Sequence, residues 1–133
     1  MAERYFTPAE VEKLIPALST VMEGVMAAHT EAAEAQARLR NEQQRIALAG
    51  GGVVDRAAWR ADAERLERRT RAVQEGLKEI LTMGGVPKDL SLGLVDFPHL
   101  RGGKEVNLCW KYGEQAIRYW HGLGEGYGGR KPL

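Results

Sequence analysis

Rows of residues with a seven-residue period run along the first 83 residues of this 133-residue chain. The period places each row on one face of an α-helix and favours packing of that face against a partner helix with a left-handed supercoil. The rows are Val11, Leu18, Val25, Ala32, Leu39, Ile46 with Leu14, Val21, Ala28, Ala35, and then Trp59, Leu66, Val73, Ile80 with Ala63, Thr70, Leu77. We refer to these rows together as the helix seam. The pattern predicts two long helices that pack along it.

The first helix has clear signals at both ends. Thr7-Pro8-Ala9-Glu10 has the form of a capping box with a proline in the first turn. Gly50-Gly51-Gly52 interrupts the seam at the other end. We therefore expect helix one over residues 7–48. Because a proline inside a helix removes one backbone hydrogen bond, we expect either a kink at Pro16 or a short helix followed by a longer one.

The second helix follows this short glycine-rich turn. Asp55 is a favoured N-cap residue, and Gly84-Gly85 followed by Pro87 ends a helix and prevents its continuation. Helix two is expected over residues 55–83. Because the turn is short, the two helices should form an antiparallel hairpin.

Near residue 92 the apolar pattern changes from helical to alternating. It predicts strands over residues 92–97, ended by Pro98, over 104–110 and over 116–121, with Gly102-Gly103 as a hairpin turn. They form a small three-stranded antiparallel meander over residues 92–121, followed by an irregular glycine-rich tail over 122–133. The chain is expected to be a single domain, residues 1–133, of the α+β class and mainly α.

A two-helix hairpin leaves part of its seam exposed unless something covers it. The sheet can cover only the end near Phe6, so the seam between Leu39 and Trp59 has no cover from the chain itself. The economical arrangement is a homodimer, in which two hairpins form a four-helix assembly.

Composition narrows the class of protein. Nineteen basic and eighteen acidic side chains give a net charge of +1, so no bulk field attracts nucleic acid, and the charged run Arg65–Arg71 is interpreted as a solvated helix face. The single cysteine excludes an internal disulfide and fits a reducing, cytoplasmic location. Neither a leader-peptide pattern nor an apolar stretch of roughly 20 residues for a membrane span is present.

Several short motifs match those of a known prokaryotic family. They are Phe6-Thr7 with Glu10 and Pro16, Gly93-Leu94-Val95-Asp96-Phe97-Pro98, Leu108-Cys109-Trp110, Gly113-Glu114, Tyr119-Trp120-His121, and Gly129-Arg130 with Pro132-Leu133. Over essentially its full length the chain resembles the family catalogued as domain of unknown function 2203. The resemblance implies a long helical hairpin followed by a short strand-rich tail, and it implies no particular activity.

Asp96, Glu114 and His121 are the leading candidates for a functional site, because they lie in or beside the predicted strands. Two carboxylates and an imidazole are a common ligand set for Zn, Mn or Fe, and the same groups serve as general acid and base. A divalent metal is the cofactor that these residues indicate. The structural alternatives are that Asp96 accepts backbone N–H bonds, that Glu114 pairs with Arg118 or Arg130, and that His121 has both nitrogens satisfied.

Other uncommon residues of the last third allow two interpretations each. Cys109 is either a nucleophile paired with His121 or a small buried hydrophobic residue, and its apolar neighbours favour the second. Trp110 and Tyr119 either line a ligand pocket or form the core of the small sheet. Arg130 either binds an anionic ligand or holds the tail to a carboxylate of the sheet.

Two functional hypotheses follow. A non-enzymatic interaction or small-ligand-binding protein is favoured, because a long helical surface and a compact aromatic tail suit recognition and no catalytic motif demands a reaction. The alternative is a metal-dependent or acid–base enzyme centred on Asp96, Glu114 and His121.

Overall fold

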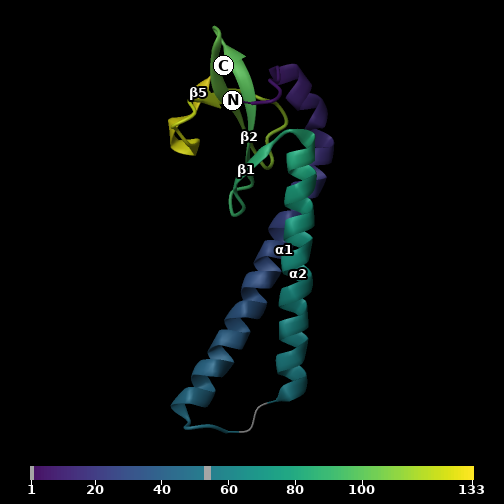
Figure 1. The fold of residues 1–133 in the computed structure, drawn as a ribbon, viewed down its shortest axis with the longest axis vertical. Helices are drawn as coiled ribbons and strands as arrows, with labels where there is room; N and C mark the ends of the chain where they lie inside the picture. The colour runs from purple at the N-terminus through teal and green to yellow at the C-terminus, as the bar shows by residue number, and fades with distance from the viewer. Residues whose placement is uncertain (1, 53–54) are drawn as a thin grey trace.

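The computed structural model describes residues 2–52 and 55–133. A helical hairpin is followed by an antiparallel sheet and a short tail that folds back onto it (Figure 1). The elements are α1 (Pro8–Leu48), α2 (Arg56–Met83), β1 (Val86–Asp89), β2 (Leu94–Arg101), β3 (Lys104–Lys111), β4 (Tyr119–His121), the 3₁₀-helix η1 (Tyr127–Gly129) and β5 (Lys131–Pro132). The predicted α+β class with two long helices is confirmed. Among the described residues, no helix combines the length and apolarity needed to cross a membrane.

Helix α1 begins and ends where the sequence predicts. The backbone N–H of Thr7 donates to Glu10 Oε1 at 2.9 Å, and that of Glu10 donates to Thr7 Oγ1 at 3.2 Å, which is the complete capping box. Pro16 lies inside one unbroken helix, and the Thr20 hydroxyl donates to its carbonyl oxygen at 3.2 Å. The helix therefore does not divide at this proline, and the bend expected there stays a prediction.

Helix α2 has the predicted cap at each end. Asp55 Oδ1 accepts a hydrogen bond from the backbone N–H of Ala58 at 3.0 Å. At the C-terminus Gly84 has φ of +100°, and its N–H bonds back to the last turn of the helix. This left-handed cap is a conformation that glycine adopts without steric cost, so Gly84 ends the helix and turns the chain toward β1.

The buried residues of the helices are concentrated toward the end of the hairpin that carries the sheet. The buried helical residues are Val11, Ile15, Leu18, Met22, Val25, Ala28 and Ala35 of α1 and Ile80 of α2. Closer to the connecting turn the seam residues are only half-buried, namely Leu39, Ile46, Trp59, Ala63 and Leu66. Figure 1 shows α1 and α2 diverging toward that turn. We refer to residues 36–71 as the distal arm and to the rest of the hairpin as the proximal half.

Within the described part of the chain the sheet has five strands, in the order β1-β2-β3-β4-β5, where three were predicted. The prediction that residues 122–133 contain no regular element is wrong, because Lys131 and Pro132 pair with Trp120 and Tyr119 as β5. Strands β1 and β5 are short edge strands, and strands of four and two residues are too short to show an alternating apolar pattern. Strand β4 is also shorter than the predicted strand over 116–121 and begins at Tyr119.

Strand β2 continues through Pro98, so the prediction that this proline ends the strand is also wrong. Pro98 lies opposite Asn107 of β3, and its carbonyl oxygen faces the other way, where it accepts the N–H of Phe6 at 2.7 Å. The missing N–H of the proline therefore falls outside the β2–β3 ladder. His99 Nδ1 lies 2.6 Å from the carbonyl oxygen of Phe6, which further fixes the N-terminal segment along this edge.

The hydrophobic core lies between the proximal half of the hairpin and one face of the sheet. The sheet contributes Val95, Phe97, Leu108 and Trp110, and the segment before β4 contributes Ile117. The Phe6 and Phe97 rings meet edge to face, with centroids 5.3 Å apart. Glu12 of α1 accepts the backbone N–H of Ile117 at 2.9 Å, which ties the helix to the end of the sheet.

Replacing the C-cap glycine of α2 should destabilise the fold. A Cβ at Gly84 would lie 2.3 Å from Cζ of the buried Phe6 ring, and the positive φ adds strain. We expect Gly84→Ala to lower the free energy of unfolding by about 2 kcal/mol in urea titrations. The matched control is Gly24→Ala in α1, where a Cβ meets nothing within 4 Å and stability should rise by about 1 kcal/mol. Equal stability of Gly84→Ala and the wild type would contradict the described cap.

Candidate functional site

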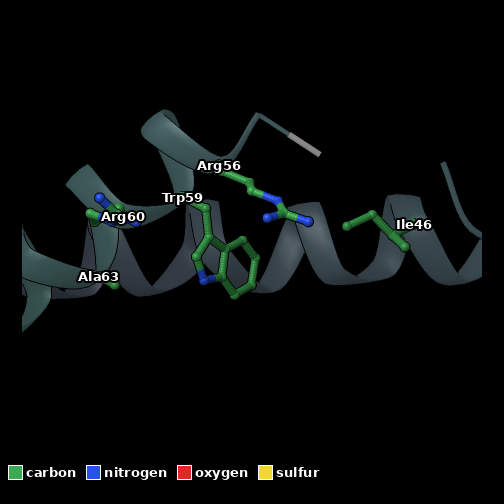
Figure 2. A pocket seen from close by; sticks show the side chains of 5 residues that line it. All are labelled: Ile46, Arg56, Trp59, Arg60 and Ala63. Carbon is green, nitrogen blue, oxygen red and sulfur yellow. The ribbon is translucent and has the colours of Figure 1, made fainter. Parts of the chain in front are cut away.

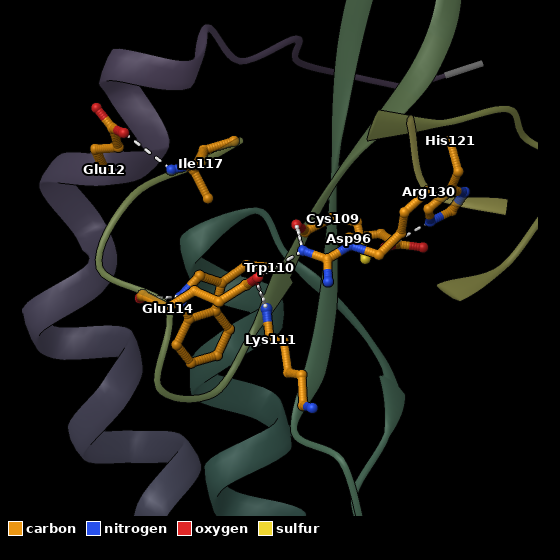
Figure 3. Close-up of polar contacts among 9 residues, drawn as sticks. All are labelled: Glu12, Asp96, Cys109, Trp110, Lys111, Glu114, Ile117, His121 and Arg130. Carbon is orange, nitrogen blue, oxygen red and sulfur yellow. Dashed lines mark hydrogen bonds and ion pairs between the residues drawn. The ribbon is translucent and has the colours of Figure 1, made fainter. Parts of the chain in front are cut away.

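Three buried polar side chains from three neighbouring strands converge on the face of the sheet opposite the helices (Figure 3). Asp96 of β2 lies directly opposite Cys109 of β3, and His121 of β4 lies opposite Asn107, two residues before Cys109. Side chains two residues apart on a strand share a face, so all three point the same way. Their relative exposures are 2%, 1% and 2%, and their potential ligand atoms all lie within 4.8 Å of one another. We refer to Asp96, Cys109 and His121 as the polar cluster.

Both ring nitrogens of His121 face oxygen atoms. Nδ1 lies 2.9 Å from the carbonyl oxygen of Gly122, and Nε2 lies 3.0 Å from Asp96 Oδ1. A carbonyl oxygen only accepts hydrogen bonds, so Nδ1 carries a proton. The second contact then holds one proton between Nε2 and the carboxyl group. Whichever atom carries it, the Asp96–His121 pair is neutral as a whole. Burying this pair in a medium of low dielectric therefore costs less free energy than burying an unpaired charge.

Cys109 does not have the environment of a nucleophile. Burial, reinforced by the negative charge of Asp96, raises the pKa of the Cys109 thiol to about 12. The thiol is therefore protonated at neutral pH, whereas the thiolate is the reactive form. The nitrogens of His121 are engaged with Asp96 and Gly122, so the geometry favours the second interpretation of Cys109, a buried and unreactive thiol.

Glu114, the third residue of the predicted trio, lies outside the polar cluster. Its carboxylate accepts the backbone N–H of Lys111 at 2.7 Å, and each of its oxygens lies 2.8 Å from Nη2 of Arg130. The same Nη2 also donates to the carbonyl oxygen of Cys109 at 3.2 Å. Arg130 thus connects the tail to a strand and to a turn, which is the structural alternative considered for both residues.

Aromatic rings complete the environment of Arg130. Its guanidinium carbon lies 4.1 Å from the centroid of the Tyr119 ring and 4.9 Å from that of Tyr127 in η1. Lys111 Nζ also lies 5.5 Å from the Tyr127 ring centroid. The tail therefore covers the face of the sheet that carries the polar cluster. Tyr119 forms part of this cover.

Trp110 lies on the face of β3 opposite to Cys109. It is fully buried in the hydrophobic core, and its indole N–H donates to the carbonyl oxygen of Glu114 at 3.0 Å. Trp110 is therefore placed as a core residue and not beside the polar cluster. Of the candidate residues, the fold brings Asp96, His121 and Cys109 together in the cluster, and it places Glu114, Trp110, Tyr119 and Arg130 outside it.

A comparison with protein-family models finds one that spans residues 4–133, described as "Uncharacterized conserved protein (DUF2203)". The chain belongs to this family. The fold expected from the resemblance, a long helical hairpin followed by a strand-rich segment, is the one observed. Among curated proteins and among solved structures, none matches the chain.

The buried thiol should resist alkylation in the native protein. A rise in the pKa of Cys109 from 9.0 to about 12 lowers its thiolate fraction at pH 8 on the order of 1000-fold. We expect iodoacetamide to label the unfolded chain rapidly at pH 8 and the native chain only as fast as it unfolds, measured by mass spectrometry. Because the unfolded chain loses this proton first, the thiol's contribution to folding stability is complete below pH 9 and declines between pH 9 and about 12. Rapid, complete labelling of the native protein would contradict this environment.

Removal of the Arg130 side chain should release the tail. Its loss leaves the Glu114 carboxylate and the Cys109 carbonyl without their charged donor. We expect amide hydrogen exchange over residues 127–133 to become at least about tenfold faster in Arg130→Ala, because bonds to charged groups are among the stronger hydrogen bonds. Arg118→Ala, which removes an exposed arginine near the same edge, is the control and should leave this exchange unchanged. Equal exchange in both variants would contradict the anchoring role.

Proposed function

We propose that this is a non-enzymatic interaction protein that acts in the cytoplasm as a homodimer, with the distal arm as its main contact surface. The observation that carries the proposal is an apolar groove in that arm, where the helix seam continues beyond the chain's own core. The groove has a volume of about 490 Å³ and is lined by Ile46, Trp59 and Ala63 with Arg56 and Arg60. Figure 2 shows the Trp59 indole projecting from α2 across α1.

The seam residues of the groove favour another helix as the occupant. Ile46 ends one row of α1, and Trp59 and Ala63 begin the two rows of α2. A seven-residue period is the pattern that coiled-coil packing requires, and within this chain α1 and α2 diverge at this level. Helices of a second copy would supply the missing partner surface.

Charge distribution favours a second copy over other helical partners. The distal arm carries nine basic and five acidic side chains, a net charge of +4. The proximal half, residues 1–35 and 72–84, carries three basic and eight acidic side chains, a net charge of −5. In a two-fold antiparallel dimer each distal arm lies along the partner's proximal half, so the same complementary contact is made twice.

Nucleic acid is a less suitable partner for the distal arm. Within the run Arg65–Arg71, Arg65 and Arg69 both pair with Glu31, and Arg71 pairs with Glu67. These ion pairs reduce the charge that the arm offers to any partner. Nucleic acid is disfavoured because the whole chain has a net charge of only +1, so no bulk field attracts phosphate groups. The single cysteine, a buried thiol without a disulfide, supports the assignment to a reducing compartment.

The geometry of the polar cluster disfavours acid–base catalysis. An acid–base enzyme needs its groups to reach a substrate, but Asp96 and His121 are each about 2% exposed. Glu114, the third member of the catalytic hypothesis, is engaged by Arg130. These two observations favour the non-enzymatic class.

The oligomeric state tests the proposal. We expect sedimentation equilibrium of the full chain to give a dimer that dissociates on dilution and weakens as salt is raised, because complementary charges contribute to the contact. Trp59→Glu should shift the protein to monomer with unchanged helicity by circular dichroism. The control is Leu123→Glu, which places the same charge at an apolar position of the tail that is 58% exposed and should leave the dimer intact.

Two results would overturn the proposal. One is a wild-type monomer at every concentration that can be measured. The other is a dimer that Trp59→Glu leaves as stable as the Leu123→Glu control does. If the monomer bound duplex nucleic acid with a steep salt dependence, the distal arm would instead be a nucleic-acid surface.

A further inference from the structure

The polar cluster combines three different metal-ligating groups at one buried point. A carboxylate oxygen of Asp96, the sulfur of Cys109 and a nitrogen of His121 lie within 4.8 Å of one another, each presented by a different strand of one sheet. We propose that Asp96, Cys109 and His121 bind a divalent transition-metal ion of the Zn²⁺ type. This site goes beyond the proposed dimer surface, because it lies on the sheet and not on the distal arm.

The orientation of the imidazole fits a ligand. Metal-binding histidines characteristically donate their second ring N–H to a carbonyl or carboxylate oxygen, which fixes the tautomer and aims the other nitrogen at the metal. In this protein Nδ1 lies 2.9 Å from the carbonyl oxygen of Gly122, and Nε2 faces Asp96. The position of the Gly122 carbonyl is itself fixed, because it also accepts the N–H of Glu125 at 3.0 Å.

Charge balance selects a divalent ion. With a metal bound, the Asp96 carboxylate and the Cys109 thiolate contribute two negative charges, and neutral His121 contributes none, so an ion of charge +2 gives a neutral buried cluster. Binding displaces two protons to solvent, one from the thiol and one from the Asp96–His121 pair. A monovalent or trivalent ion would leave an uncompensated charge among groups that are 1–2% exposed, which is costly.

The surrounding charges do not oppose this ion. Arg130 is the single arginine of the tail sequence, and its charge is balanced by the carboxylate of Glu114, with both Nη2–oxygen distances at 2.8 Å. Its contact with Cys109 is to the backbone carbonyl oxygen and not to the sulfur. The sulfur therefore remains available to the cluster.

The ligand types narrow the choice of metal. A thiolate with an imidazole favours zinc, cobalt or copper over magnesium and calcium, which prefer oxygen ligands. Three protein ligands also leave one position of a tetrahedral ion for a small additional ligand. The structure contains these three donors and not the trio of Asp96, Glu114 and His121.

Cobalt titration of the full-length protein tests the site. Co²⁺ reports sulfur ligation through an intense thiolate-to-metal charge-transfer band in the near ultraviolet. We expect one equivalent of Co²⁺ to produce this band in metal-free wild type, Zn²⁺ to abolish it by competition, and Mg²⁺ to have no effect. Cys109→Ser should lose the band, and Glu114→Gln, which alters the neighbouring carboxylate, should keep it.

Controls separate the site from surface binding and from misfolding. His29→Ala removes a histidine from the exposed surface of α1 and should keep the band. Circular dichroism shows whether each variant is folded, and the wild type decides the question if Cys109→Ser does not fold. Absence of the band in folded wild type, or its persistence in folded Cys109→Ser, would overturn the proposal. Trp59→Glu should bind Co²⁺ normally, so the failure of either proposal is recognised independently of the other.

Discussion

Strands β2 and β3 pair with Asp96 opposite Cys109 and with Phe97 opposite Leu108. Side chains alternate along a strand, so this register directs Phe97 and Leu108 toward the helices and the two polar residues toward the tail. A shift of one residue would exchange the faces, bury a carboxylate against α1 and expose the apolar core. The hydrophobic core and the polar cluster therefore depend on the same register.

The hairpin and the sheet have separate roles in this account. The proximal half of the hairpin is used to cover the sheet, and its buried seam residues end at Ala35 in α1. The distal arm extends beyond the sheet with half-buried apolar residues and a net positive charge. Its proposed contact with a second copy and the proposed metal site lie in different parts of the molecule, so each can be disturbed without the other.

The helical part of the fold could be predicted almost residue by residue. Capping at Thr7 and at Asp55 is a local hydrogen-bonding effect, and the left-handed cap at Gly84 is a local backbone preference, so the sequence signals are strong. Strand ends were predicted less well. Whether Pro98 interrupts a ladder depends on which side its nitrogen faces, and whether Lys131–Pro132 forms a strand depends on a partner that comes earlier in the chain.

The candidate site was predicted in part for a similar reason. Asp96 and His121 were identified from residue type, but the choice of Glu114 over Cys109 as their companion was not supported by the geometry. If Gly102-Gly103 is a two-residue turn, Arg101 faces Lys104, and the residue numbers of every facing pair add to 205. Cys109 then lies opposite Asp96. The strand register of the predicted hairpin could therefore have identified Cys109 as the neighbour of Asp96. The contact between Glu114 and Arg130 depends on how the tail folds back, and no local pattern contains that information.

X-ray absorption spectroscopy at the zinc edge of zinc-loaded, untagged protein reports directly whether the sulfur of Cys109 is a metal ligand. We expect a first shell with one sulfur at about 2.3 Å and nitrogen or oxygen ligands at about 2.0 Å. A first shell that contains only nitrogen and oxygen would contradict it, because Cys109 would then not be a ligand. A protein that holds no zinc after loading would contradict it equally.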